Sequence, residues 1–226
     1  FDLTVSVPYN PMTEYNADLK LMIESLRHGA RVLYESTDGQ VQIGLIKVYG
    51  PKDNWGMIHY HEDLAGADLC KRQCVKTYGL FQDSKTIHLG LDHLKERIKN
   101  FGHEQGMRLQ GETVAHELMH DLYNLKDEYL DAGGDEGGDC PGHSGLGQKT
   151  GICIMARKGA PELCRGLLHD EDTKQHCEHE QSCYETVCDF YEEEMGLSLV
   201  VPPLVSSNAN VPADPEVALY VSYTTK

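Results

Sequence analysis

Apolar and polar residues alternate at the start of the chain and then recur at helical spacing. Residues 2–7 alternate as a β-strand does, and Pro8 and Pro11 interrupt that pattern. Residues 15–34 then carry apolar side chains three and four positions apart, which predicts a helix with one face in the core. The apolar positions of this helix are Leu19, Met22, Ile23, Leu26, Ala30 and Leu33.

The same two periods continue through the next stretch of the chain. Asp38 and Gly39 predict a turn, and residues 41–49 predict a second strand. Residues 51–84 show no sustained period and are expected to form loops, whereas residues 86–91 predict a third strand and residues 92–100 a short helix. This order of elements predicts an α/β lobe built on a mixed sheet.

The strongest pattern covers residues 107–129, which predict a helix with one apolar face and one face that bears potential metal-binding and catalytic side chains. His116 and His120 are four residues apart, so both imidazoles lie on the same side of a helix. Asn124 follows the last periodic residue and tolerates the left-handed conformation, so the helix is expected to end there. The apolar face comprises Met107, Gly111, Val114, Ala115, Leu118 and Leu122.

His116-Glu117-Leu118-Met119-His120 form an H-E-x-x-H motif. Two histidines at this spacing bind one zinc ion, and the adjacent Glu117 is placed to act on a water as a general base. Asp127 would add a third ligand and leave one position open, as in catalytic zinc sites. The alternative is a pair of surface histidines on an ordinary amphipathic helix.

The extended pattern H-E-x-x-H-x-x-x-N-x-x-D-E-Y, with a methionine downstream, resembles the metzincin clan of zinc endopeptidases. Its spacing is similar to that of the metalloprotease domain of calcium-activated chloride channel regulator proteins, and to bacterial IgA-peptidase-like enzymes. The resemblance covers residues 112–129 and Met155. Asn124 stands where that family has a turn glycine, and Lys126 occupies the third-ligand position of the common clan pattern.

The resemblance assigns roles to residues around the motif. It implies that Asp127 is the third zinc ligand and that Met155 forms an apolar floor under the metal. Glu128 and Tyr129 complete the D-E-Y pattern and would support the site and shape the cleft. For Met155, plain core packing is the alternative.

The resemblance also implies a two-lobed catalytic domain over residues 1–197. Its upper lobe would span about residues 1–123 and its lower lobe about residues 124–197. Residues 198–226 are predicted to be a linker followed by a strand at 217–222. That strand either begins a further module or packs on this domain.

Composition narrows the classes of partner. The chain has 226 residues and a net charge of −16, which argues against nucleic acid because phosphates would be repelled. No apolar run reaches membrane-spanning length, and the N-terminus lacks a charged and then apolar leader, so Phe1 is expected to be a mature or trimmed start. The expected partner is a protein or peptide substrate, and the oligomeric state is open.

Eight cysteines predict four disulfides and an oxidising compartment, so the protein is expected to be secreted, extracellular or periplasmic. The sequence does not choose among the 105 pairings that eight cysteines allow. Six of the cysteines follow residue 139, so the lower lobe is expected to be irregular and crosslinked. They are Cys140, Cys153, Cys164, Cys177, Cys183 and Cys188, and the other two are Cys70 and Cys74.

Two further stretches have metal-binding composition. Residues 131–139 form an acidic, glycine-rich loop that could supply oxygen ligands to Ca²⁺, but the loop lacks an EF-hand pattern and a solvated loop is favoured. His59 and His61 form an H-x-H pair that would bind a metal on one face of a strand. Ordinary surface or hydrogen-bonded histidines are the favoured interpretation of that pair.

The sequence therefore predicts a zinc-dependent endopeptidase in which a zinc-activated water hydrolyses peptide bonds. Glu117 would be the general base, and His116, His120 and Asp127 the zinc ligands. The alternative is a zinc-binding interaction module that keeps the fold without turnover. Glu117 favours the enzyme, because metal binding alone does not require it.

Overall fold

A computed structural model describes the chain over residues 1–13, 16–50, 56–63, 79–82, 86–125, 153–155, 163, 182–199 and 214–220. The chain divides into two compact units, and neither unit is one continuous stretch of sequence. The first unit comprises Phe1–Val32, Gln42–Asp121 and Pro212–Lys226, and the second comprises Leu33–Val41 and Leu122–Val211.

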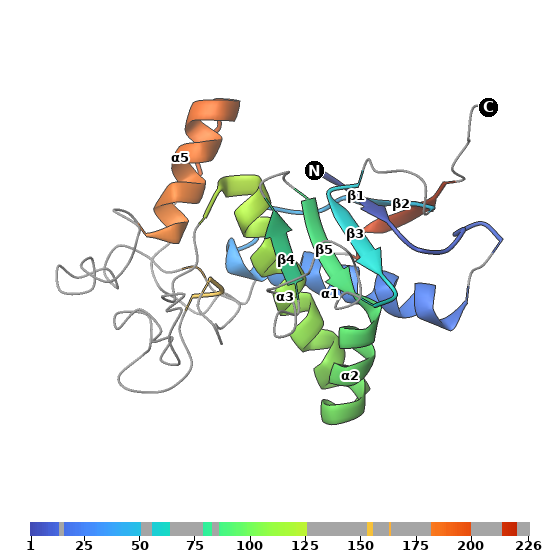
Figure 1. The fold of residues 1–226 in the computed structure, drawn as a ribbon. Coiled ribbons are helices and arrows are strands. Elements are labelled where there is room, and N and C mark those ends of the chain that lie inside the picture. Colours follow the sequence, from blue (N-terminus) through green and yellow to red (C-terminus); the bar gives the residue numbers. More distant parts are fainter. Residues whose placement is uncertain are drawn as a thin grey trace. The chain divides into compact units, whose positions relative to one another are not determined.

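The first unit is built on a mixed six-stranded sheet (Figure 1). Five strands run parallel to their neighbours, and β4 runs antiparallel to β5 at one edge. The mixed α/β sheet predicted from the sequence is therefore confirmed. In the order β4-β5-β3-β1-β2-β6, the strands are Gly79–Gln82, Thr86–Gly90, Ile58–His61, Asp2–Ser6, Leu45–Tyr49 and Glu216–Leu219.

The prediction that residues 51–84 form only loops is wrong, because this stretch contains β3 and β4. β3 has four residues, of which Ile58 and Tyr60 are buried while the intervening histidines are partly exposed. Four residues are too few to display a period in the sequence. The strand is stabilised instead by pairing with β1 on one side and β5 on the other, which are contacts that only the tertiary fold supplies.

The strand predicted near the C-terminus packs on this sheet. β6 pairs in parallel with β2, where Val217 is opposite Ile46, and Tyr220 stacks on Tyr49 with ring centroids 4.8 Å apart. Just before β6, Asp214 accepts hydrogen bonds from the Arg31 guanidinium at 2.6 and 2.8 Å. Residues 214–220 are thus held to the sheet and to the first helix.

Two of the helices cross at closely packed glycines. These are α1 (Ala17–Ser36) and α3 (His103–Tyr123), which Figure 1 shows on one side of the strands. A Cβ atom on Gly29 would lie 2.4 Å from Val114 Cγ1, and one on Gly111 would lie 2.7 Å from His28 Cβ. Larger residues at the crossing would therefore push the two helices apart. The predicted apolar faces of both helices are buried, except that Leu122 is partly exposed.

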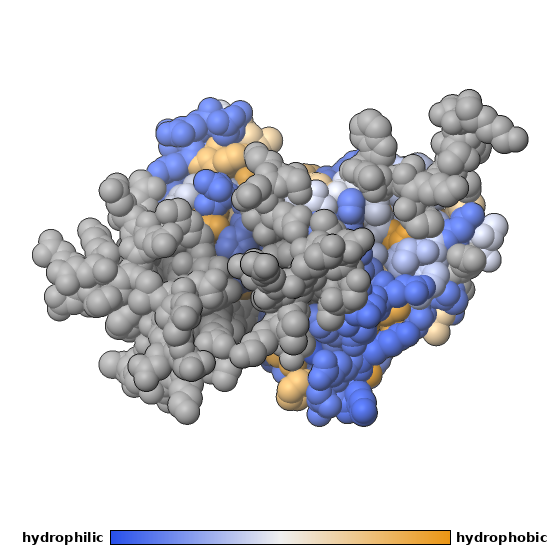
Figure 2. Space-filling model, in the orientation of Figure 1, coloured by the Kyte–Doolittle hydropathy of each residue, from blue (hydrophilic) through white to orange (hydrophobic). Residues whose placement is uncertain are grey.

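A short turn joins the metal-motif helix to the helix before it. α2 (Leu91–Phe101) ends at Gly102, whose φ of 83° is a conformation that favours glycine. α3 then begins at His103, four residues before the predicted start. α2 has a hydrophilic outer surface, which is visible in Figure 2. Its exposed residues are Lys95, Glu96, Lys99, Asn100 and Phe101.

The described part of the second unit is dominated by α5 (Cys183–Met195). Ser182 and Glu185 form a capping box at its start, and Gly196 ends it in the left-handed conformation with φ 63°. The hydroxyl of Tyr184, which is fully buried, donates to the Thr37 carbonyl at 3.3 Å. α5 is thereby fastened to the turn that follows α1.

Two predictions concern residues that the structure describes only in part. Among the described cysteines, Cys153 and Cys183 are buried and Cys188 is partly exposed, and no disulfide joins one of these three to another. The other five cysteines lie outside the described residues, so the four-disulfide arrangement remains a prediction. Within the described ranges, no helix is long and apolar enough to cross a membrane.

Candidate metal centre

The two motif histidines converge on one point beside α3. The helix spans the whole motif without a break, and the Nε2 atoms of His116 and His120 lie 3.1 Å apart. Two nitrogens that each lie about 2.0–2.1 Å from a tetrahedral zinc are about 3.3 Å apart. Both rings are partly exposed to solvent. The donor atoms therefore fit a zinc ion with little rearrangement.

Glu117 lies between the two histidines in sequence and is only 7% exposed. Burial of a carboxyl group in this way is unusual unless the group has a partner or a function. The next two residues, Leu118 and Met119, are fully buried in the core. The helix thus fixes Glu117 close to the histidines while its apolar face anchors the backbone.

A buried arginine on α2, which no pattern in the sequence indicates, holds α3 in place. Arg97 Nη1 lies within donating distance of three acceptors on α3. These are the Leu109 carbonyl at 2.7 Å, Gln110 Oε1 at 2.9 Å and Thr113 Oγ1 at 2.8 Å. Arg97 is 8% exposed. The signal in the sequence was weak, because one arginine at a core position of a short helix resembles a surface charge.

The end of the motif helix has the predicted geometry. α3 ends at Tyr123, and Asn124 follows with φ 52°, in the left-handed region. In the second unit, the Tyr123 hydroxyl lies 3.0 Å from that of Tyr191, and its ring packs edge-on against Phe190 at 5.3 Å. Burial and this neighbouring hydroxyl raise the pKa of Tyr123. Within the second unit, Tyr123 is therefore packed against α5.

Several predicted site residues are not in the described ranges. Asp127, Glu128 and Tyr129 lie outside them, as does the acidic loop proposed for calcium. Within the described residues, no group of three or more His, Cys, Asp or Glu side chains is arranged to hold a metal ion. Met155 is fully buried, which both of its interpretations expected. The assignments of Asp127 as third ligand and of Met155 as floor remain predictions.

A second group of histidines lies on the sheet. His59 and His61 belong to β3, and His88 lies opposite His59 on the parallel strand β5. His61 Nε2 is 2.9 Å from His88 Nδ1, and the rings of His59 and His88 meet edge to face at 5.5 Å. The sequence pattern had paired only His59 with His61, because the partnership with His88 depends on strand register.

Burial determines the protonation of this group. His88 is 4% exposed, and burial together with the neighbouring His61 and His59 lowers its pKa to about 4. Burial also lowers the pKa values of His59 and His61, although the Asp92 carboxylate opposes this for His61. The rings are therefore neutral at neutral pH, and each carries a nitrogen lone pair.

Comparison of the chain with protein-family models, curated proteins and solved structures finds no match. Any functional conclusion consequently depends on the geometry and chemistry of the residues themselves.

Proposed function

We propose that the protein is a zinc-dependent endopeptidase. The observation that carries the proposal is the pair of Nε2 atoms 3.1 Å apart on α3, with the buried Glu117 beside them. His116 and His120 would hold the ion together with Asp127. When bound, zinc lowers the pKa of water and polarises a carbonyl group.

Glu117 does the proton transfer in this proposal. Its carboxylate accepts a proton from the water that attacks the scissile carbonyl carbon, and later returns that proton to the leaving amine. A group with this role contributes about 10²–10⁴-fold to the rate.

The metzincin form of the fold is part of the same proposal. The mixed sheet with the motif helix against it is what supports an upper lobe of that type. Met155 would lie under the metal, and Glu128 and Tyr129 would shape the substrate cleft. Secretion into an oxidising compartment, with protein or peptide substrates, completes the proposal.

A non-catalytic zinc-binding module is the competing function. It would need the two histidines but not Glu117, and it would tolerate any small residue at that position. The glutamate next to His116 is what favours the enzyme, because zinc binding alone does not require a carboxylate at that position.

The test is Glu117→Gln, assayed for casein or gelatin cleavage with and without a chelator. The expected result is a loss of activity of about 10²–10⁴-fold with zinc still bound. Glu112→Gln is the matched control: Glu112 is on the same helix and pairs with Arg108 at 2.9 Å, so its replacement should leave turnover unchanged.

Two outcomes would contradict the proposal. One is cleavage by Glu117→Gln within about tenfold of the parent. The other is a zinc-loaded parent that cleaves neither protein, which would favour the non-catalytic module.

A further inference from the structure

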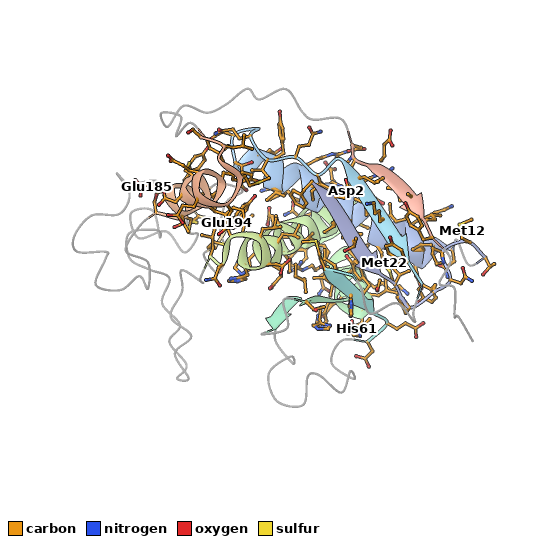
Figure 3. All side chains as sticks on the ribbon, turned by 90° about the horizontal axis from the view of Figure 1, so that it is seen from above. Asp2, Met12, Met22, His61, Glu185 and Glu194 are labelled. Carbon is orange, nitrogen blue, oxygen red and sulfur yellow. The ribbon has the colours of Figure 1, made fainter. Side chains whose placement is uncertain are left out.

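The histidines on β3 and β5 form a compact group away from the motif helix. Tyr60, which separates His59 from His61, contacts Ser25 of α1 through its hydroxyl. Because side chains alternate across a strand, His59 and His61 lie on the opposite face of the sheet from α1. Strand register then brings His88 to that face next to His59. His61, the last residue of β3, is labelled in Figure 3.

The ring nitrogens of His59, His61 and His88 have lone pairs that their hydrogen bonds do not all use. Only one proton can lie between His61 Nε2 and His88 Nδ1, which are 2.9 Å apart. His59 hydrogen-bonds to the backbone of Gly56, and its Nε2 is buried with no hydrogen-bond partner among the described residues. A buried polar nitrogen without a partner is costly, so its position calls for an explanation.

We propose that His59, His61 and His88 form a second metal site, which takes a transition-metal ion that prefers imidazole, such as Zn²⁺, Ni²⁺ or Cu²⁺. The ion takes the place of the proton between His61 and His88, and that proton moves to the other nitrogen of its own ring, so both rings bind as neutral imidazoles. Their nitrogens need to separate by about 0.4 Å to reach the spacing of two ligands on tetrahedral zinc. The three rings do not form a closed ligand set as they stand. His59 therefore turns its Nε2 toward the ion.

Binding at this site would tie two central strands together. β5 leads directly into α2, and α2 holds the motif helix through Arg97. An ion bound only to the folded state raises the melting temperature, and its stabilisation grows with the logarithm of the ratio of its concentration to its dissociation constant. The expected effect of the ion is therefore on stability, and it does not depend on the proposed peptidase activity.

The experiment counts zinc ions per chain after equilibration with zinc chloride and gel filtration. His61→Gln should lower the count by one, whatever the count of the parent. Glutamine can still donate a hydrogen bond to His88 Nδ1, so the fold is expected to persist. His103→Gln is the control, because His103 is exposed on another element and should keep the parental count.

Zinc binding measured in a protein without His116 and His120 distinguishes the proposed sheet site from the site on α3. With His116→Ala and His120→Ala in place, zinc should still bind, and adding His61→Gln should weaken that binding at least about tenfold. Loss of an outer-shell partner alone costs 10–100-fold, so loss of a direct ligand should cost no less. Mg²⁺ and Ca²⁺, which prefer oxygen ligands, should not compete.

Melting temperatures provide the second measurement. Zinc should raise the melting temperature of the parent and of His103→Gln but not of His61→Gln. If His61→Gln fails to fold, His59→Gln is the alternative variant, since it leaves the His61–His88 contact in place and should weaken zinc binding. An unchanged zinc count and affinity in both His59→Gln and His61→Gln would overturn the site. Failure of the peptidase proposal would leave this result intact.

Discussion

The two histidine groups of this protein bring ring nitrogens to similar distances by different means. On α3, His116 and His120 are 3.1 Å apart because four residues complete about one helical turn. On the sheet, His61 and His88 are 2.9 Å apart although 27 residues separate them. The first group follows from local geometry, and the second from the register of two parallel strands. Neighbouring histidines on a helix can therefore be recognised from their spacing in the sequence. Neighbouring histidines on two strands cannot, because their spacing depends on strand register.

The largest expected effect is on zinc binding and activity when Asp127, the proposed third ligand, is replaced. Asp127→Ala should abolish peptidase activity and weaken zinc binding at least about a hundredfold, because the proposed function makes Asp127 a direct ligand rather than an outer-shell partner. Glu128→Ala should keep the metal. Zinc titration of the two variants measures the difference. Tight stoichiometric zinc in Asp127→Ala, with loss in Glu128→Ala, would move the ligand by one residue.

The next largest effect is expected on stability, when Arg97 is replaced. It tests whether the histidine spacing within α3 is independent of the contacts that hold α3 in place. Arg97→Met should lower the free energy of unfolding by about 2–4 kcal/mol, because buried acceptors on α3 lose their donor. The zinc affinity of the folded variant should change less, since the spacing of His116 and His120 is set within α3. Urea denaturation gives the first quantity and zinc titration the second.

Lys99→Met is the control for Arg97→Met, because Lys99 is exposed on the same helix. Its stability should stay within about 0.5 kcal/mol of the parent. A loss below about 1 kcal/mol in Arg97→Met would show that the arginine does not anchor α3.

The smallest effect is at the end of the motif helix. Asn124 has φ 52°, a conformation that costs most residues about 1–2 kcal/mol. Asn124→Ala should therefore lower the free energy of unfolding by about 1 kcal/mol, whereas Asn124→Gly should change it by less than about 0.5 kcal/mol. Thermal or urea unfolding of the two variants measures this. Equal stabilities would mean that the left-handed geometry is not maintained in solution.

The elements with a clear period were predictable from the sequence. The buried face of α1, the stripe of α3 and the stop at Asn124 all follow from spacing and backbone preference, so they needed no partner to be recognised. The mixed sheet followed from the order of these elements. β3 was missed because it has four residues and half of them are histidines.

The sequence by itself determined the H-E-x-x-H helix, because the spacing of its histidines and the apolar face of α3 are both local properties of the chain. Only the tertiary structure decided that Arg97 anchors this helix, that residues 216–219 join the sheet beside β2, and that His88 meets His61. Each of these contacts joins residues far apart on the chain or on different elements. Their partners are selected by strand register and core packing, which no periodicity within a single segment encodes.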